Sequence, residues 1–361
     1  MRLSDFVCEY ISNYTKHVFC LVGGGSMWLN DSLGKSKLTP VFMLHEQGAA
    51  FAAQAYGHIT NQLGVCMVTT GPGATNAITG CLAAWMDSTP VLFISGQVQT
   101  SQMIGESGLR YKGTQEVDII SMVEHITKYS LTIRDPKKIK IYLGAAIQAA
   151  THGRKSPVWL DIPLDIQSAE IEPDELEPFT VMPNEWLDWQ RQENINQGVQ
   201  MVIEATRNCS KPVILAGHGI IASNAEKQFF ELIDAFKCPV LTTWKSIGLL
   251  SYNHPLYAGR PGGIGQRAAN KIQQTCDLLL VLGAQMNLDQ VAYNLDAVAP
   301  NAVRIVVDID PAELKKYNGW ITIQADIKEF LSALKVGGDY GQWARDCKEM
   351  QKDNIFILEK G

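Results

Sequence analysis

The sequence lacks several features that mark particular classes of protein. Its eight cysteines include no C-x-x-C pair, and most lie inside apolar patterns. They therefore indicate buried thiols in a reducing cytoplasm and not a disulfide or zinc framework. The net charge is −6 and there is no long basic run, which disfavours nucleic acid and anionic membranes as partners. We find no signal peptide and no membrane-spanning apolar run, and we expect a cytoplasmic protein.

The chain has the length and the pattern of a two-domain α/β protein. Its 361 residues exceed the roughly 100–200 residues of a common domain. Short apolar runs alternate with helix-like segments in both halves, which predicts two doubly wound domains with mostly parallel sheets. An acidic, proline-bearing segment over 168–193 is typical of a linker. We therefore expect domains over 1–167 and 194–336 and a second linker over 337–361.

The first half is organised around the stretch HEQGAAFAAQAYG, which runs from His45 to Gly57. The apolar run 41–44 before it predicts a buried parallel strand, and its alanines predict a helix. Glu46 therefore lies where a strand ends and a helix begins, and ligands of open α/β sheets bind at such places. Alternatively, a carboxylate there does no more than stabilise the helix by interacting with the positive end of its dipole. This stretch alone leaves both interpretations open.

Two further expected strands end in glycines. The apolar run 18–22 leads into the glycines 23–25, and the run 65–69 leads into the turn and helix start TGPGATN. Glycine allows the backbone to approach a ligand closely. We therefore expect these two strand ends and Glu46 to form one rim at the edge of the sheet.

In combination, these motifs resemble the pyrimidine-binding domain of thiamine diphosphate enzymes, and most of all the acetolactate synthase-like group. The motifs are, in order, GGG, HEQGAAFAAQAYG, TTGPGATN, SGQV and QEVD. The resemblance implies that Glu46 contacts N1′ of the cofactor's aminopyrimidine ring. It also implies that four further residues line the same half-site or its substrate side, namely Gly24, Pro72, Asn76 and Gln115.

The resemblance implies a reaction as well. A 2-oxoacid, pyruvate in the first instance, loses CO2 on the cofactor, and the two-carbon unit is added to a carbonyl acceptor, either a 2-oxoacid or a keto sugar. Glu46 and Gln115 are the implied catalytic residues. An apolar site can keep a carboxylic acid protonated, because burial disfavours its charged form. The alanines around Glu46 are compatible with such burial.

The segment between Gly96 and Asp118 has no periodicity, which is typical of functional or mobile loops. Ordinary acetolactate synthases have a shorter loop here and an aromatic residue where this chain has Thr114. Two interpretations stay open. The segment is either a surface insertion without consequence or a changed acceptor pocket, in which Arg110 and Lys112 could meet a phosphate.

The second half resembles the central domain of the same family, which holds a flavin dinucleotide (FAD) in acetolactate synthases. The matching positions are Gly217, Gly219, Thr243, Gly283, Asp308 and Asp326. One departure is Gln285, because flavin-binding members carry arginine there, and glutamine cannot replace its bidentate phosphate contact. The alternatives are a bound FAD and a scaffold without nucleotide.

In this family a third domain holds Mg²⁺ and the diphosphate through a Gly-Asp-Gly…Asn signature, which the sequence does not contain. We therefore expect the first two domains of such an enzyme, inactive alone, with Mg²⁺ held by an absent domain. The family places the cofactor between chains, which implies a homodimer or homotetramer. The alternative is a non-catalytic assembly or binding subunit.

Overall fold

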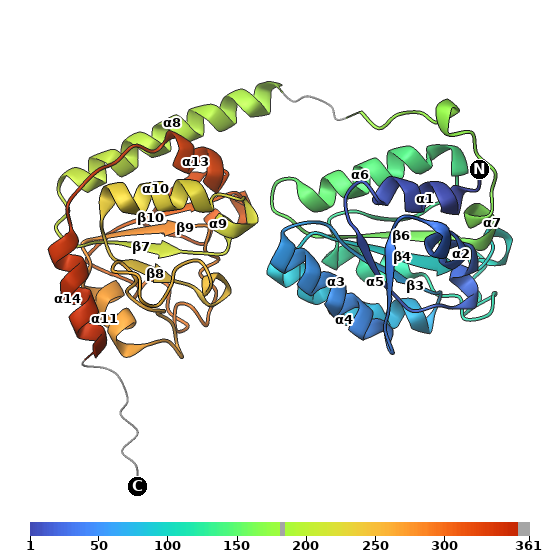
Figure 1. Ribbon diagram of the computed structural model, residues 1–361, viewed down its shortest axis with the longest axis horizontal. Coiled ribbons are helices and arrows are strands. Elements are labelled where there is room, and N and C mark those ends of the chain that lie inside the picture. Colours follow the sequence, from blue (N-terminus) through green and yellow to red (C-terminus); the bar gives the residue numbers. More distant parts are fainter. Residues whose placement is uncertain (181–184, 353–361) are drawn as a thin grey trace, which may run out of the picture. The chain divides into compact units, whose positions relative to one another are not determined.

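The chain divides into two compact units, Met1–Met182 and Pro183–Gly361. A computed structural model describes residues 1–180 and 185–352 (Figure 1). Each unit is built on its own parallel sheet with helices on both faces, so the predicted α/β class is confirmed. No helix in the described ranges combines the length and the apolar character needed to cross a bilayer.

The first unit contains a six-stranded sheet in the order β2-β1-β3-β4-β6-β5, and its strand pairs are parallel. The strands are β1 (His17–Cys20), β2 (Thr39–Phe42), β3 (Gly64–Val68), β4 (Val91–Gln97), β5 (Ser130–Thr132) and β6 (Pro157–Pro163). The helices are α1 (Leu3–Ile11), α2 (Met27–Lys35), α3 (Glu46–Thr60), α4 (Pro72–Asp87), α5 (Ile119–Val123), α6 (Ile139–Thr151) and α7 (Leu164–Gln167).

Two apolar layers bury this sheet. One contains residues of α1 and α6, and the other contains residues of α3 and α4, so strands β3, β4 and β6 are buried along their length. Figure 1 shows the two pairs of helices on opposite faces. Continuous apolar runs are expected for parallel strands that are covered on both sides.

The prediction of a buried strand at 41–44 is wrong in one respect. Strand β2 pairs in parallel with β1 as expected, but it lies at the edge of the sheet. Phe42 is 64% exposed and Leu44 is fully exposed. An apolar run predicts burial, but it does not say whether the covering surface belongs to the same chain.

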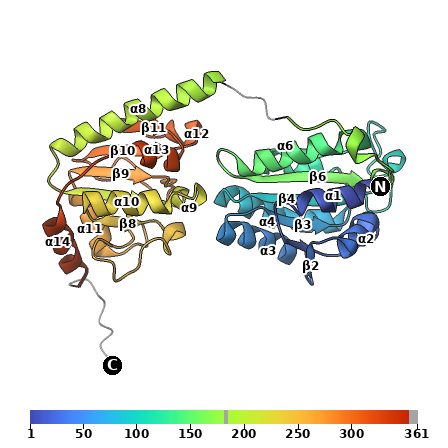
Figure 2. The same cartoon turned by 45° about the horizontal axis from the view of Figure 1, so that its top comes forward.

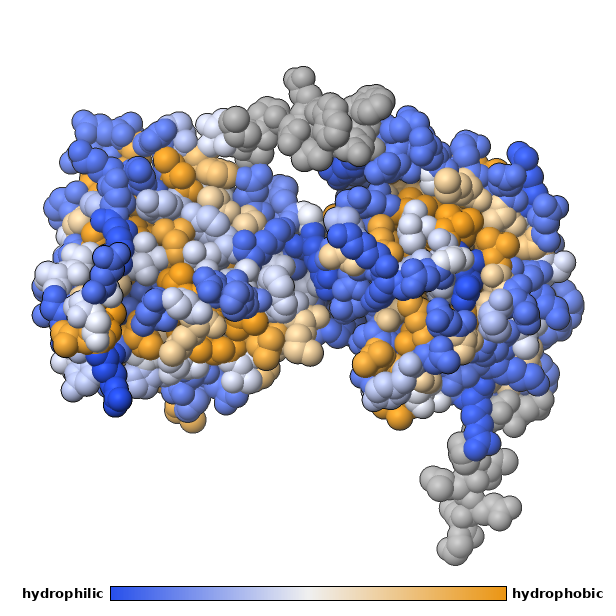
Figure 3. All heavy atoms as spheres, turned by 180° about the vertical axis from the view of Figure 1, so that it is seen from behind, coloured by the Kyte–Doolittle hydropathy of each residue, from blue (hydrophilic) through white to orange (hydrophobic). Residues whose placement is uncertain are grey.

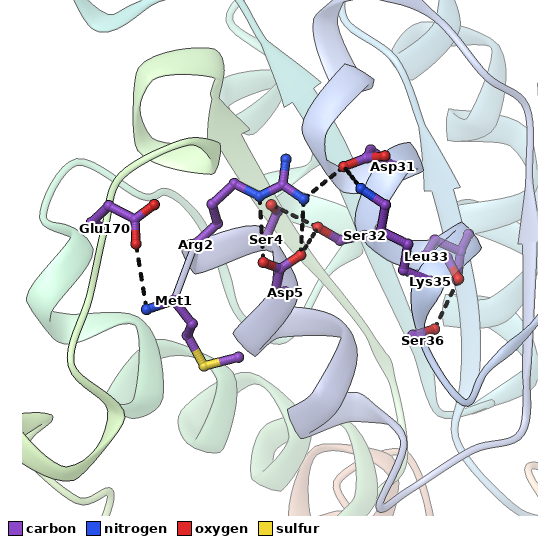
Figure 4. A network of polar contacts seen from close by, with 10 residues as sticks. All are labelled: Met1, Arg2, Ser4, Asp5, Asp31, Ser32, Leu33, Lys35, Ser36 and Glu170. Carbon is purple, nitrogen blue, oxygen red and sulfur yellow. Dashed lines mark hydrogen bonds and ion pairs between the residues drawn. The ribbon is translucent and has the colours of Figure 1, made fainter.

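The N-terminus is hydrogen-bonded to two other segments of the first unit. Arg2 donates to Asp5 on α1 and to Asp31 on α2, and Ser32 on α2 donates to Asp5 over 2.6 Å (Figure 4). In addition, the amide of Leu3 donates to the carbonyl of residue 169. These contacts position α2, which follows the glycine turn 23–25, and they attach residues 169–171 to the first unit.

The second unit contains a five-stranded parallel sheet in the order β11-β10-β9-β7-β8 (Figure 2). The strands are β7 (Pro212–Ala216), β8 (Val240–Thr242), β9 (Leu278–Leu282), β10 (Val303–Asp308) and β11 (Ile321–Gln324). The helices are α8 (Glu185–Arg207), α9 (Gly219–Ala222), α10 (Glu226–Phe236), α11 (Arg267–Thr275), α12 (Pro311–Leu314), α13 (Ile327–Ala333) and α14 (Gly341–Lys352). Helices α8, α10 and α13 contribute to the apolar core on one face, and α11 and α14 contribute to that on the other.

Both segments expected as linkers contain regular structure. Helix α8 begins at Glu185, inside the segment 168–193. Helix α14 lies inside the segment 337–361 and packs Trp343 and Cys347 into the second unit. A polar composition is shared by linkers and by surface helices with one apolar stripe, so composition alone does not separate them. Residues 181–184 and 353–361 of these segments lie outside the described residues.

Candidate functional site

The N-terminal ends of α3 and α4 bring Glu46 and Asn76 together. Helix α3 begins at Glu46, and the preceding His45 caps it by accepting a hydrogen bond from the amide of Gln47. The side-chain amide of Asn76 donates to Oε2 of Glu46 over 2.9 Å. Glu46 is only partly buried in the described chain. The contact fixes one carboxylate oxygen and leaves Oε1 for another donor.

The turn between β3 and α4 can be formed only with glycine at position 71. Gly71 has a φ of +61°, and a Cβ there would lie 2.0 Å from the carbonyl oxygen of Gln115. Gln115 itself has a φ of +62°, which is uncommon for a residue with a side chain. Gly73 lies beside the carboxylate, since a Cβ there would be 3.4 Å from Oε1 of Glu46. The turn therefore joins the surroundings of Glu46 to those of Gln115.

Thr69, which lies outside the residues predicted for the site, connects the strand ends of the expected rim. Its hydroxyl accepts from the amide of Gly25 over 3.1 Å. A Cβ at Gly23 or at Gly73 would lie within 2.6 Å of its side chain. By contrast, a Cβ at Gly24 would meet nothing within 4 Å. Thr69 thus brings the glycine turn 23–25 next to the turn that precedes α4. The backbone faces open space at Gly24. The doubled threonine of TTGPG is the signal that could have indicated Thr69.

A pocket of about 510 Å³ adjoins this rim. Its lining residues are Gly71, Pro72, Thr75, Arg110, Tyr111, Gln115, Glu116 and Val117. Two of the residues predicted for the site, Pro72 and Gln115, therefore share one pocket. Tyr111 lies in no motif, because no sequence pattern distinguishes a pocket wall from an exposed loop. Glu116 belongs to the motif QEVD, but the motif assigned it no role.

The loop before Gln115 is closed by one carboxylate. Glu116 accepts hydrogen bonds from the amides of Ile104, Lys112 and Gly113, the last two over 3.0 and 3.2 Å. This arrangement separates the two basic residues. Arg110 lines the pocket, whereas the ammonium group of Lys112 donates to the carbonyl of Ser101 over 2.7 Å. Lys112 therefore holds the loop together, and Arg110 is the cation that the loop presents to the pocket.

The thiols near the site are not nucleophiles. Burial raises the pKa of the Cys66 and Cys81 thiols well above the ordinary value, so both stay protonated and unreactive. All eight cysteines are free, and all but Cys209 are buried. In the described residues no group of three or more His, Cys, Asp or Glu side chains could hold a metal ion.

In the second unit, the predicted nucleotide glycines contact one another. A Cβ at Gly217 would lie 2.2 Å from the carbonyl oxygen of Gly283, and a Cβ at Gly219 would lie 2.7 Å from its Cα. The amide of Gly219 also donates to that carbonyl over 2.9 Å. The close approach of the two loops that follow β7 and β9 therefore explains these glycines without a ligand.

The predicted polar residues of the second unit likewise have partners in the fold. Asp326 caps α13, Asp308 accepts from the amide of Asp310, and the hydroxyl of Thr243 lies 3.0 Å from that of Ser246. Gln285 donates to the carboxylate of Glu313 over 2.9 Å. A carboxylate thus lies beside the position where arginine would meet a flavin diphosphate. These residues fit an FAD poorly, because Gln285 is neutral, its amide is occupied by Glu313, and it offers no bidentate phosphate contact.

Comparison with known proteins assigns a family to both units. Residues 1–122 match the N-terminal TPP binding domain of thiamine pyrophosphate enzymes, and residues 199–334 match the central domain of the same enzymes. Thiamine pyrophosphate is another name for thiamine diphosphate. The two matched segments fall in separate units of the structure.

Several acetolactate synthases are similar to this chain along most of its length. It is 35% identical over 353 residues to a probable acetolactate synthase large subunit of Methanocaldococcus jannaschii, with 95% of this chain and 58% of the relative covered. It is 36% identical over 341 residues to the acetolactate synthase isozyme 2 large subunit of Escherichia coli (strain K12), with 94% and 59% covered. The chain thus spans somewhat more than half the length of these relatives. With both domain models matched and relatives similar over more than nine-tenths of its residues, the chain belongs to the thiamine pyrophosphate enzymes.

Proposed function

We propose that this chain provides the pyrimidine-binding half-site of an acetolactate synthase-like enzyme. The enzyme decarboxylates a 2-oxoacid, pyruvate in the first instance, and transfers the two-carbon unit to a carbonyl acceptor. The observation that carries the proposal is the hydrogen bond between Asn76 and Glu46 at the N-terminal ends of two adjacent helices. The acetolactate synthases among the relatives support it.

The residues fit the aminopyrimidine end of thiamine diphosphate. Glu46 has one oxygen held by Asn76 and the other available for the ring nitrogen N1′. Gly73 leaves room beside that oxygen, and the backbone at Gly24 faces open space. When bound, the cofactor supplies a nucleophilic carbon and accepts the electrons of the decarboxylation. Glu46 would share a proton with N1′ of the bound cofactor, and Asn76 holds the carboxyl group in place.

Mg²⁺ and the diphosphate belong to a different part of the enzyme in this proposal. The family resemblance assigns them to a third domain, and the relatives are longer than this chain. The metal and the diphosphate carry the largest charges at such a site. The 361 residues alone should therefore bind thiamine diphosphate weakly and turn over no pyruvate.

The substitution Glu46→Gln tests the assignment in the complete protein. Glutamine keeps the size of the side chain but cannot share a proton with N1′ as a carboxylic acid does. Exchange of the cofactor's C2 proton, followed by NMR, should slow by about 10²-fold or more. Glu9→Gln, an exposed change on α1, is the matched control and should leave the rate unchanged. Equal rates for Glu46→Gln and wild type would refute the role. A wild type without C2 exchange or turnover would favour the non-catalytic subunit.

Arg110 and Lys112 allow a matched test of the acceptor. We propose that Arg110 contacts an anionic group of the acceptor, such as the phosphate of a nucleotide-linked keto sugar. Arg110→Ala should then lower turnover of that acceptor roughly tenfold or more and affect 2-oxobutyrate less. Lys112→Ala is the control, because the ammonium group of Lys112 contacts Ser101. If Arg110→Ala changes turnover of neither acceptor, the loop does not form the acceptor pocket.

We also propose that the enzyme is a homodimer or homotetramer. Figure 3, drawn from behind, shows that apolar residues reach the molecular surface in places. On the first unit, large apolar side chains of β2, α3, α4 and adjoining residues are exposed. They are Phe42, Leu44, Phe51, Leu82, Trp85 and Met86. Such surface is typical of protein interfaces. Sedimentation at micromolar concentration should show a dimer or a larger species, and a monomer would contradict the proposal.

For the second unit we propose a structural role without flavin. The glycines that suggest a nucleotide contact each other, and Gln285 contacts a carboxylate. Purified protein should lack flavin absorbance and should not acquire it on incubation with FAD.

A further inference from the structure

A carboxylic acid lies in the middle of the sheet of the first unit and takes no part in the function proposed above. Asp161 on β6 is 1% exposed, and the strand register places it between Ser95 on β4 and Thr132 on β5. Ser95 donates to Oδ1 over 2.6 Å, and Thr132 donates to Oδ2 over 3.3 Å. The third donor is Gln97 on β4, whose amide nitrogen lies 3.1 Å from Oδ2.

Gln97 uses its whole hydrogen-bonding capacity in this environment. Its Nε2 donates to Asp161 and to the carbonyl of Val117 over 2.8 Å. Its Oε1 accepts from the hydroxyl of Thr70 and from the amide of Val98, both over 2.9 Å. A primary amide offers two donors and a carbonyl oxygen with two lone pairs, so no hydrogen-bonding group of Gln97 is left over.

The neighbours allow only one orientation of this amide. The carbonyl of Val117 can only accept and the backbone amide of Val98 can only donate, and Oδ2 of Asp161 accepts from the Gln97 amide. Turning the amide over would place oxygen against oxygen and N–H against N–H. Asp161 therefore helps to direct the Gln97 oxygen toward Thr70.

The two outer partners of Gln97 belong to two different segments that line the pocket or adjoin its lining. Thr70 directly precedes Gly71 and Pro72, which line one wall, and Val117 follows Gln115 in the other. These walls also touch at Gly71, where a Cβ would meet the carbonyl of Gln115. Gln97 does not line the pocket itself. Its side chain is hydrogen-bonded both to Thr70, beside one lining segment, and to Val117 in the other.

We propose that Gln97 and Asp161 are positioning residues that set the distance between the two walls of this pocket. Asp161 orients the Gln97 amide, and Gln97 holds the turn 70–73 and the segment 115–118 together. The structural part of this inference is independent of the proposed function. Its consequence for turnover rests on that function.

Amide hydrogen exchange of the full 361-residue chain tests the inference. Gln97→Met keeps a similar volume and removes all four hydrogen bonds. Exchange should become roughly tenfold faster in both segments, 70–73 and 115–118, because each loses a buried hydrogen bond. Thr70→Val removes only one of the contacts and should speed exchange only in the segment 70–73.

The matched control is Thr127→Val. Thr127 is buried in the same unit, and its hydroxyl donates to the carbonyl of Val123 over 2.8 Å. This change removes one buried hydrogen bond whose partners do not line the pocket, and it should leave both segments unchanged. If Gln97→Met speeds exchange in one segment or in neither, or if the control gives the same pattern, the inference is wrong.

Two further measurements keep the test decisive. If Gln97→Met does not fold, Asp161→Asn replaces it, and unchanged exchange in both segments would then overturn the inference.

In the complete protein, Gln97→Met should lower kcat/KM for the acceptor while C2 exchange stays at the wild-type rate, because Glu46 keeps its contact with Asn76. Loss of C2 exchange would contradict a role confined to the pocket walls. An inactive wild type would count against the proposed function, and the exchange data would still decide the positioning role.

Discussion

Asp161 shows how much the surroundings of a single residue change its chemistry. Burial raises the pKa of its carboxyl group from 3.8 to about 7, although hydrogen bonds from Ser95, Gln97 and Thr132 act in the opposite direction. Desolvation is the larger effect because the group is removed from water in the middle of the sheet. The acid is therefore held partly protonated near neutral pH.

This shift predicts how the stability of the chain depends on pH. The pKa of Asp161 is higher in the folded state than in the unfolded state, so its stabilising contribution is complete below about pH 4 and is lost as pH rises through about 7. Urea unfolding of wild type should show the free energy of unfolding decreasing by about 2 kcal/mol more between pH 5 and pH 7 than in Asp161→Asn. Identical pH profiles for the two proteins would show that the carboxyl group does not titrate in this range.

At the scale of elements, the contact between α3 and α4 determines where Glu46 and Asn76 meet. The buried residues of these two helices are alanine and glycine apart from Cys81, which allows the helices to approach closely. A Cβ at Gly80 would lie 2.4 Å from Cβ of Ala50 and 2.9 Å from its carbonyl carbon. Backbone atoms cannot rotate away as a long side chain can, so the helices would have to move apart.

Two glycine-to-alanine substitutions separate packing from helix propensity. Alanine favours a helix over glycine by about 1 kcal/mol, but overpacking a tight contact costs about 1–3 kcal/mol. Gly80→Ala should therefore lower the free energy of unfolding by up to about 2 kcal/mol. Gly34→Ala on α2 is the control, because a Cβ there meets nothing within 4 Å, and it should raise the free energy of unfolding by about 0.5–1 kcal/mol. A stabilised Gly80→Ala variant in denaturant titrations would mean that the helices are less closely packed.

At the scale of the whole molecule, the apolar cores are separate. Two core clusters contain only residues of the first unit, and the other two contain only residues of the second. The core of the first unit includes Ile171 and Leu176, and the amide of Ile171 donates to the carbonyl of Met1. The segment 169–176 therefore contributes to the first unit.

Fragments of the chain should fold according to these cores. Residues 1–182 and 183–361, produced separately, should each unfold cooperatively in urea when followed by circular dichroism, because each keeps its complete cores. A fragment 1–167 should be less stable than 1–182 by about 2–5 kcal/mol, because it lacks two buried side chains and their backbone pairing. Equal midpoints for 1–167 and 1–182 would show that the segment 169–176 adds nothing.

The sequence by itself determined the parallel α/β class, the position of Glu46 at the start of a helix and the glycine turns of the rim. These properties are local. Alternating apolar runs and helix-favouring segments specify the elements, and a positive φ or a close contact requires glycine wherever the rest of the chain lies. The family resemblance added the cofactor half-site.

Only the tertiary structure decided which residues meet. It placed β2 at an exposed edge, turned Lys112 toward Ser101 and left Arg110 in the pocket. It also joined Gln97 to Asp161, which lies 64 positions away. Such contacts depend on strand order and register, and a shift of one residue would turn a side chain to the opposite face of the sheet. The physical reason is that a local pattern specifies an element but not its neighbours.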